Sequence, residues 1–275
     1  MKTWEGLGYY SRARNLHATA RYVSEELKGK FPNSYSGLIK LKGVGPYTAA
    51  AIASICFNEV TPVLDGNVFR FIARHFGLEK DIAEAKNRKF FIEILEDLID
   101  HDQPDLFNQA MMEFGATVCA PKPICAECVF RTSCFAYEND KQTVLPVKSK
   151  KVKVKEQFID YYIAQFDSLF LMKRRSENIW HGLYEFPSII AGQTGTTNPW
   201  IKKYQSAKIT QSSESIKHLL THRRLWVRFH HVAVNSEEEF HELAKELNFN
   251  IYSREEVLSL PVPKVISNHL QRISF

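Results

Sequence analysis

The pattern with the clearest chemistry in this sequence is a cluster of cysteines. Four of the five follow the spacing Cys-x5-Cys-x2-Cys-x5-Cys over residues 119–134: Cys119, Cys125, Cys128 and Cys134. Four thiolates at this spacing ligate either an iron–sulfur cluster or a structural zinc ion, and the spacing alone does not choose between them. A disulfide framework would instead be spread along a small secreted chain. The segment is therefore predicted to bind a metal, whereas the isolated Cys56, on the apolar face of a predicted helix, is expected to be an inert core residue.

A second pattern is the stretch LKGVGPYTAAAIASI, residues 41–55. Gly43 and Gly45 permit a tight turn, and Pro46 suits the first position of a helix because its missing N–H would have no partner there. Backbone N–H groups at such a helix N-terminus form a favourable seat for a phosphate. An ordinary corner between two helices fits the same residues, since short glycine motifs are weak signals.

A carboxylate follows this turn in the stretch VLDGNVFRFIARHFG, where Asp65 lies twenty residues after Gly45. Asp-Gly marks a turn and aspartate is a favoured helix N-cap, so a purely structural role fits Asp65. The functional alternative is a carboxylate at the mouth of a cleft, close to the glycine hairpin. Asn67 would then orient a substrate or a water molecule beside it.

The composition is that of a globular protein of two ordinary domains, with 275 residues, 44% hydrophobic and 24% charged. A net charge of +5 is compatible with a nucleic-acid partner without establishing one. The sequence contains neither a run of about 18 apolar residues nor the order of a signal peptide. We therefore expect a cytoplasmic protein that has no membrane partner.

The pattern of apolar residues changes about half-way along the chain. Up to residue 137, apolar residues recur at three- and four-residue spacing in five segments, which predicts an all-helical domain. Six lysines, no acid and Pro146 occupy residues 141–155 and indicate a basic linker. After it come runs rich in β-branched and aromatic residues, then the amphipathic segment EEFHELAKELNF, which together predict an α+β domain.

Several of these motifs, in this order, carry a family resemblance. WEGLGYYSRARNL, LKGVGPYTAAAI, LDGNVFR, FNQAMMEFGATVC and the four cysteines resemble the helix-hairpin-helix DNA glycosylases with an iron–sulfur cluster, and most closely the MutY-type adenine DNA glycosylases. NIWHGLYEFP resembles the signature of that family's Nudix-like C-terminal domain. The resemblance implies a multi-domain fold: an all-α glycosylase domain at 1–137 with its iron–sulfur loop at 119–134, a basic linker at 138–156 and an α+β Nudix-like domain at 157–275.

The resemblance also implies a reaction, the removal of adenine mispaired with 8-oxoguanine or guanine in double-stranded DNA after the adenine is flipped out. Asp65 matches the aspartate that stabilises the sugar cation, and Asn67 a polar residue beside it. Tyr47 stands where the endonuclease III type carries a lysine nucleophile. Without an amine no Schiff base forms, so a monofunctional glycosylase is expected. The implied cofactor is a [4Fe-4S] cluster, with structural zinc as the alternative.

Further residues are implied to contact DNA. Tyr9 matches a tyrosine that wedges into the base stack beside 8-oxoguanine, although a half-buried core tyrosine would also fit. Arg12 would contact phosphates or lie on an ordinary exposed helix face. The hairpin residues expected at the DNA backbone are Lys42, Gly43 and Gly45.

In the second domain, LLTH at 219–222 aligns with the family's recognition loop for 8-oxoguanine, usually Phe-Ser-His. Thr221 retains the hydroxyl and His222 the imidazole, whereas Leu220 replaces the aromatic residue. The domain lacks the glutamate-rich Nudix box, so pyrophosphate hydrolysis is not expected.

The start of the sequence carries one further expectation. In the family, WEGLGYY is preceded by helices, one of which bears the glutamate that protonates the leaving adenine, a role typically worth about 10² to 10⁴ in rate. Glu5, Glu25 and Glu26 are not expected to replace it. Two readings follow: an adenine glycosylase with an incomplete N-terminus, or a truncated, non-catalytic binder of DNA containing 8-oxoguanine. A bifunctional pyrimidine glycosylase is disfavoured by Tyr47 and by the C-terminal domain.

Overall fold

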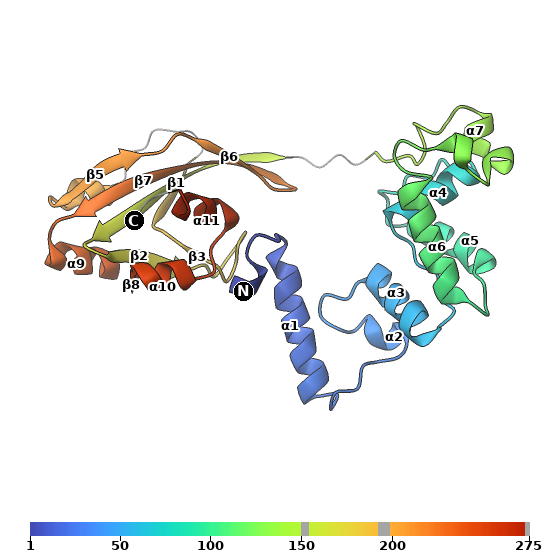
Figure 1. Ribbon diagram of the computed structural model, residues 1–275, viewed down its shortest axis with the longest axis horizontal. Coiled ribbons are helices and arrows are strands. Elements are labelled where there is room, and N and C mark those ends of the chain that lie inside the picture. The colour runs from blue at the N-terminus through green and yellow to red at the C-terminus, as the bar shows by residue number, and fades with distance from the viewer. Residues whose placement is uncertain (150–153, 192–198, 273–275) are drawn as a thin grey trace. The chain divides into compact units, whose positions relative to one another are not determined.

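The structure is a computed structural model that describes residues 1–149, 154–191 and 199–272. These residues form two compact units (Figure 1). The helical unit comprises Asn15–Lys151, and the sheet unit comprises Met1–Arg14 together with Val152–Phe275. The long helix α1, Tyr10–Glu25, therefore supplies residues to both units.

The helical unit confirms the prediction of an all-helical first region. Besides α1, its helices are α2 (Tyr35–Leu38), α3 (Pro46–Phe57), α4 (Gly66–His75), α5 (Asn87–Leu98), α6 (Pro104–Thr117) and α7 (Phe135–Glu138), with short 3-10 turns at Cys125–Glu127 and Arg131–Ser133. One core joins α4, α5 and α6 around the fully buried Phe91 and Leu95. A second joins α1, α2 and α3 around Leu38, Val23 and Ala53.

Cys56 is a correction to the sequence prediction. It was expected in the core, but its side chain is exposed near the C-terminal end of α3. Helix α3 is apolar on all sides, so the sequence pattern does not identify the face that is buried. The buried face carries Ala49, Ala50, Ala53 and Ser54, whereas Ile55 and Phe57 are exposed alongside Cys56.

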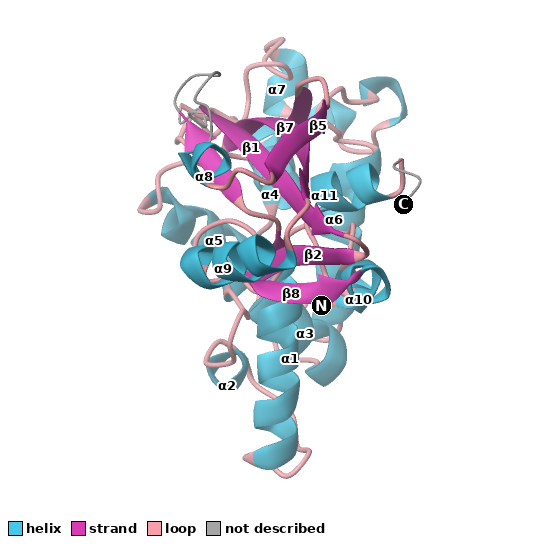
Figure 2. Ribbon diagram, turned by 90° about the vertical axis from the view of Figure 1, so that its left-hand side faces the viewer, coloured by secondary structure: helices cyan, strands magenta, loops and turns pink. Residues whose placement is uncertain are grey.

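The sheet unit is a mixed α+β fold, as predicted. Its strands are β1 (Lys155–Phe166), β2 (Leu169–Arg174), β3 (Tyr184–Glu185), β4 (Ser188–Ala191), β5 (Ala207–Ser212), β6 (Ile216–Leu219), β7 (Arg223–Val234) and β8 (Asn250–Ser253). The central strands run in the order β3-β2-β1-β7-β5, while β4 pairs with β1, β6 with β7 and β8 with β2. Strands β1 and β7 are parallel, and all the other described pairs are antiparallel. Figure 2 draws the strands in magenta and the helices in cyan.

Alternation along the strands divides the side chains of the sheet between two cores. Tyr161 and Phe229 lie on one face, where α10 (Arg254–Ser259) and α11 (Lys264–Leu270) cover them. Tyr162, the residue after Tyr161, and Val232, three residues after Phe229, lie on the other face. There they pack with α8 (Pro199–Lys203) and α9 (Glu237–Leu247). Tyr10, near the N-terminus, is buried in the first of these cores, which explains why residues 1–14 belong to the sheet unit.

The segment predicted as a linker, 138–156, begins with residues that are bonded to the helical unit. The carbonyl of Leu145 accepts a hydrogen bond from Arg74, and the carbonyl of Val147 accepts one from the amide of Ile82. Strand β1 begins at Lys155, inside the predicted segment, while residues 150–153 lie outside the described part. The division at 137 and 156 stays a prediction. None of the helices in the described ranges is long and apolar enough to cross a membrane.

Candidate functional site

The predicted catalytic carboxylate, Asp65, lies at the N-terminus of α4. Its Oδ1 accepts hydrogen bonds from the amides of Asn67 and Val68, each at 2.8 Å, and its Oδ2 accepts one from Asn67 Nδ2 at 3.0 Å. Asp65 is therefore the N-cap of α4, and its catalytic role stays a prediction. Asp65 is half-buried, and because a carboxylate has about four lone-pair sites, Oδ2 with its single described partner retains capacity for a further one.

Helix α6 fixes the segment that leads to Asp65. The buried amide of Asn108 accepts a hydrogen bond from the amide of Val63 at 2.8 Å and donates one to the carbonyl of Thr61 at 3.0 Å. About two turns further along α6, Gly115 packs so closely that a Cβ atom there would lie 2.7 Å from the carbonyl oxygen of Asn67. Only glycine permits this approach, so the N-terminus of α4 is held at a set distance from α6.

The same face of α6 also receives Tyr47. The hydroxyl of Tyr47, on α3, donates a hydrogen bond to Met112 Sδ at 3.8 Å. Met112 and Gly115 are three residues apart and therefore share one side of the helix. The structure thus places two of the predicted catalytic residues, Tyr47 and Asn67, against one side of α6.

Arg70 was not identified from the sequence, and it connects the predicted carboxylate site to the cysteine segment. Its Nη2 donates to Asn67 Oδ1 at 2.8 Å and to the carbonyl of Gly115, and its Nε donates to the carbonyl of Cys119 at 2.7 Å. Burial, followed by the charge of Arg74, lowers the pKa of Arg70 from its usual range. The three-residue spacing of Asn67 and Arg70 on a predicted helix was the available signal for this contact.

The four cysteines predicted to bind a metal line one small pocket with a volume of about 20 Å³. Phe71, Phe130, Val118 and Pro123 supply its apolar walls. Burial raises the pKa of the Cys119 and Cys125 thiols. Over residues 1–149, 154–191 and 199–272, no three His, Cys, Asp or Glu side chains converge closely enough to hold one ion. The thiols therefore share one pocket without meeting at one point.

The predicted glycine hairpin joins α2 to α3, and α3 begins at Pro46 as expected. Gly43 has φ +82°, and a Cβ atom there would lie 2.5 Å from the Cβ of Asn15 on α1. Thr19 of the same helix donates to the carbonyl of Lys42 at 2.8 Å. Helix α1 thus packs against one side of the turn. The Lys42 side chain is exposed, and the space beside Gly45 is open.

In the sheet unit, two predicted DNA contacts that are far apart in the sequence meet. The hydroxyls of Tyr9 and Thr221 are hydrogen-bonded at 2.9 Å. Thr221 and His222 form the exposed tip of the turn between β6 and β7, and Leu220 packs beneath them against the core. Tyr9 is 67% exposed, which contradicts the alternative of a half-buried core tyrosine. Arg12 is exposed on α1.

Comparison with known proteins gives a consistent result for both units. Residues 1–97 match the family model of the HhH-GPD superfamily base excision DNA repair proteins, and residues 161–272 match the NUDIX domain. An adenine DNA glycosylase of Buchnera aphidicola subsp. Acyrthosiphon pisum is 29% identical over 98% of this chain and 78% of that protein. The adenine DNA glycosylase of Buchnera aphidicola subsp. Baizongia pistaciae is 32% identical over 97% of this chain and 76% of that protein. This chain belongs to the adenine DNA glycosylase family.

Among solved structures, a thermostable thymine-DNA glycosylase is similar over 46% of this chain and 59% of that chain, with 33% identity and a TM-score of 0.42. In this adenine DNA glycosylase family member, the hairpin, Tyr47, Asp65 and Asn67 fall inside the HhH-GPD match. Thr221 and His222 fall inside the NUDIX match.

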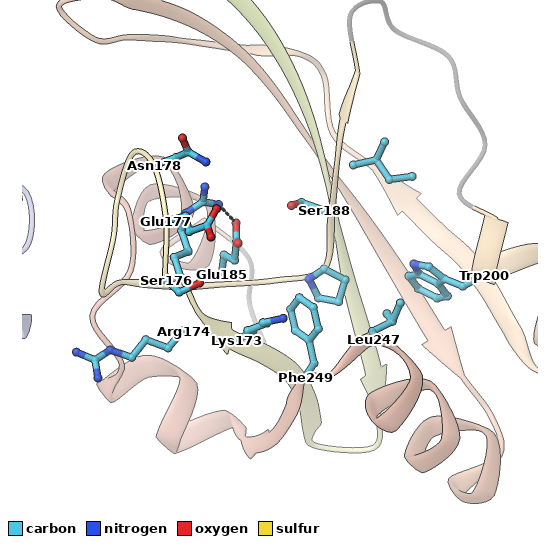
Figure 3. Close-up of a pocket in the computed structure, with 13 residues that line it drawn as sticks. Lys173, Arg174, Ser176, Glu177, Asn178, Glu185, Ser188, Trp200, Leu247 and Phe249 are labelled. Carbon is cyan, nitrogen blue, oxygen red and sulfur yellow. Dashed lines mark hydrogen bonds and ion pairs between the residues drawn. The ribbon is translucent and has the colours of Figure 1, made fainter.

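This family member also has a large pocket in the sheet unit that was not predicted from the sequence (Figure 3). Lys173 and Arg174, at the end of β2, line it with the aromatic side chains of Trp200 and Phe249. Arg175 and Glu185 form a largely buried ion pair within it, and burial raises the pKa of Glu185. None of the predicted catalytic or DNA-binding residues lines this pocket.

Proposed function

We propose that this chain removes adenine mispaired with 8-oxoguanine, or with guanine, from double-stranded DNA as a monofunctional glycosylase. The observation that carries the proposal is the Asp65 carboxylate, held by two backbone amides and the Asn67 side chain in a member of the adenine DNA glycosylase family. The anion is half-buried, and its Oδ2 accepts only one described hydrogen bond, which leaves lone pairs for a substrate.

The chemistry follows from the charge that develops on the sugar. When the bond between C1′ and the adenine nitrogen breaks, the deoxyribose becomes an oxocarbenium-like cation, and an adjacent fixed carboxylate lowers its energy. Asn67 keeps Asp65 oriented, and Arg70 in turn holds Asn67. Tyr47 carries no amine, so no Schiff base forms with the opened sugar and the DNA strand is not cleaved.

The leaving adenine also needs a proton. Two of the glutamates before the hairpin are already in ion pairs, Glu5 with Lys2 at 2.8 Å and Glu25 with Arg21 at 2.9 Å. Neither is a free acid aimed at a substrate. The measured excision rate will therefore show whether the general acid lies within this chain.

The four cysteines fit a [4Fe-4S] cluster better than a single zinc ion. A zinc ion requires all four sulfurs at about 2.3 Å from one point, whereas these thiols share a pocket and do not converge. In a cluster, each thiolate ligates its own iron. Cys119, Cys125, Cys128 and Cys134 would hold the cluster, which would supply a rigid, charged centre for the segment.

The partner is double-stranded DNA, which a monomer binds through two surfaces. The hairpin of Lys42, Gly43 and Gly45, in which Lys42 and Gly43 are exposed and the space beside Gly45 is open, supports contacts with backbone phosphates, as helix N-termini and lysines commonly make. Tyr9, Thr221 and His222 are exposed together and support recognition of 8-oxoguanine, with Tyr9 as the stacking wedge.

The test is single-turnover release of adenine by the full chain from a duplex with adenine opposite 8-oxoguanine. Excision well above background, without strand cleavage, supports the proposal. Tight binding of this duplex with no excision, by protein whose iron content is intact, would show a binder that lacks the general acid. Strand cleavage without added base would contradict the monofunctional assignment.

A further inference from the structure

Arg74 is a buried cation beside the cysteine pocket. Arg74 is only 4% exposed. Among the described residues of the helical unit, it is the only buried residue that carries a charge. It lies on α4, one turn after Arg70, and it lines the pocket that the four cysteines form.

The guanidinium of Arg74 bonds to the cysteine segment at several points. Nη1 donates to the carbonyl of Ala120 at 2.8 Å and lies 3.5 Å from Cys119 Sγ, while Nη2 donates to the carbonyl of Pro121 at 3.2 Å. On the opposite side, Nε donates to the carbonyl of Leu145 at 3.0 Å. The cation therefore joins the first cysteine to the segment that follows α7.

The backbone of Arg74 reaches the last cysteine as well. Its carbonyl oxygen lies 3.7 Å from Cys134 Sγ, within the range of a hydrogen bond from sulfur. One residue thus contacts both the first and the fourth cysteine of the pattern. These sulfurs are fifteen residues apart in the sequence, and both contact Arg74 of α4.

The charge balance around Arg74 is incomplete without an anion. Within the described residues, no carboxylate forms an ion pair with this arginine, and its partners are neutral carbonyls and a sulfur. A buried charge without a counter-charge is costly, and removing a partner from such a charge is strongly destabilising. Thiolates around an iron–sulfur core would supply the missing negative charge at the atom to which Nη1 already points.

We propose that Arg74 is a positioning residue for the iron–sulfur site, holding the Cys119 thiolate through an N–H···S hydrogen bond and balancing the charge of the cluster. It thereby sets how firmly the cluster is retained and raises its reduction potential, because hydrogen bonds and positive charge near cluster sulfurs favour the more negative, reduced state. This inference rests on the proposed cluster but not on adenine excision.

Arg70 and Arg74 have separate tasks in this arrangement. Both donate to the carbonyl of Cys119, but Arg70 turns toward Asn67, and the acceptors of its described hydrogen bonds are all oxygen atoms. Arg74 turns toward Cys119 Sγ and the Ala120 and Pro121 carbonyls. The identity of the residue at 74 is therefore expected to control the cluster directly.

The experiment compares the full chain with Arg74→Met, Arg74→Lys and the control Arg131→Met. Arg131 lies within the cysteine segment and is exposed, and its side chain contacts the Tyr137 ring instead of a thiol. Iron and sulfide per chain, the rate of bleaching of the cluster absorbance by a chelator and the reduction potential are measured without DNA.

Arg74→Met is expected to lose its cluster about tenfold faster and to show a more negative potential, since loss of an outer hydrogen bond to a metal ligand typically weakens metal binding by about 10- to 100-fold. Arg74→Lys keeps the positive charge but loses the planar guanidinium with its several N–H donors. The cluster absorbance of this variant should therefore bleach at an intermediate rate. Arg131→Met should match the unmodified chain.

Equal bleaching rates and equal potentials in all four proteins would overturn the role of Arg74. Zinc in place of iron in the unmodified chain would instead overturn the proposed cluster, and with it this inference. If Arg74→Met does not fold, bleaching of Arg74→Lys at the rate of the unmodified chain still contradicts the role of the guanidinium at Cys119. None of these outcomes depends on whether the chain excises adenine.

Discussion

The surroundings of Asp65 in the helical unit and the turn at Thr221 in the sheet unit are built in opposite ways. Asp65 is bonded to two backbone amides and to an asparagine that Arg70 holds in turn. Thr221 lies at an exposed turn and its described side-chain partner is the hydroxyl of Tyr9, which is itself exposed.

The difference corresponds to the two proposed tasks. Stabilising a short-lived cation requires an anion that is already fixed in position before the bond breaks. Reading a damaged base requires groups that are accessible to DNA and that the duplex itself can order. We therefore expect substitutions around Asp65 to change the rate strongly, and substitutions at the turn to change selectivity modestly.

The largest effect is expected from Asp65→Asn. Asparagine is as good an N-cap as aspartate, so α4 should remain intact while the negative charge is lost. Single-turnover excision should fall about a thousandfold, with little change in duplex binding. The matched control is Asp100→Asn, because Asp100 also accepts two backbone amides before a helix, at 2.8 and 2.9 Å, and it should leave the rate unchanged. An Asp65→Asn rate within tenfold of the unmodified chain would contradict the proposed role.

The second prediction concerns how the stability of the sheet unit depends on pH. His269 stacks on Phe229 with ring centroids 3.9 Å apart, and its Nε2 lies 3.1 Å from that of His231. Burial, with the nearby His231 and Arg272, lowers the pKa of His269 to about 4. Because the unfolded pKa is about 6.5, the unfolded state binds more protons between these values, and stability is lost as the pH falls through this window.

We expect a loss of up to ~3 kcal/mol in the free energy of unfolding of the sheet unit between pH 7.5 and pH 4 from this group. All four tryptophans, Trp4, Trp180, Trp200 and Trp226, belong to that unit, so urea unfolding followed by tryptophan fluorescence reports it selectively. His269→Phe should reduce the pH dependence, whereas the exposed His241→Gln should retain it. An unchanged slope in His269→Phe would show that other groups control the acid sensitivity.

A third, smaller effect tests whether the fixed geometry around Asp65 matters in itself. Asn67→Ala removes the hydrogen bond to Asp65 Oδ2 and the bond from Arg70 but leaves the carboxylate charge in place. Excision should fall about tenfold, the effect of losing one hydrogen bond to a charged group. Gln109→Ala, at an exposed position on α6, should leave the rate unchanged. If Asn67→Ala retains the full rate, the backbone amides alone hold the carboxylate.

The smallest effect is expected at the exposed turn. Tyr9→Phe and Thr221→Val each remove the bond between the two hydroxyls, and each should lower the preference for 8-oxoguanine over guanine by about threefold. Binding to the two duplexes is the measurement, and the double variant should lose less than the product of the single losses. Thr210→Val, at an exposed site on β5, is the control. A thousandfold loss at the turn would remove the contrast between the two regions.

Much of the fold and part of the site were predictable because they depend on local patterns. The helical and α+β regions follow from periodicity, Pro46 begins α3, and Asp65 caps α4 as its residue type favours. Cys56 was misplaced because α3 is apolar on every side, so periodicity does not select its buried face.

The residues that hold the site were missed for a different reason. Asn108, Gly115 and the two arginines of α4 act through backbone carbonyls or close packing with segments about 45 residues away. Carbonyl acceptors are present in every residue, so no pattern of side-chain types marks which ones an arginine will meet.

The sequence by itself determined the chemical inventory: four thiols at ligand spacing, a carboxylate at a helix start, a glycine hairpin and a threonine and histidine in a predicted recognition loop. Residue type and short-range spacing are local properties, and backbone sterics convert them directly into turns and caps. Only the tertiary structure decided which of these groups meet. Three contacts depend on packing between distant segments: the Tyr9–Thr221 hydrogen bond, the packing of Tyr47 and Asn67 against one side of α6, and the contacts of Arg74 with two cysteines. Side-chain volume and burial determine how these segments pack.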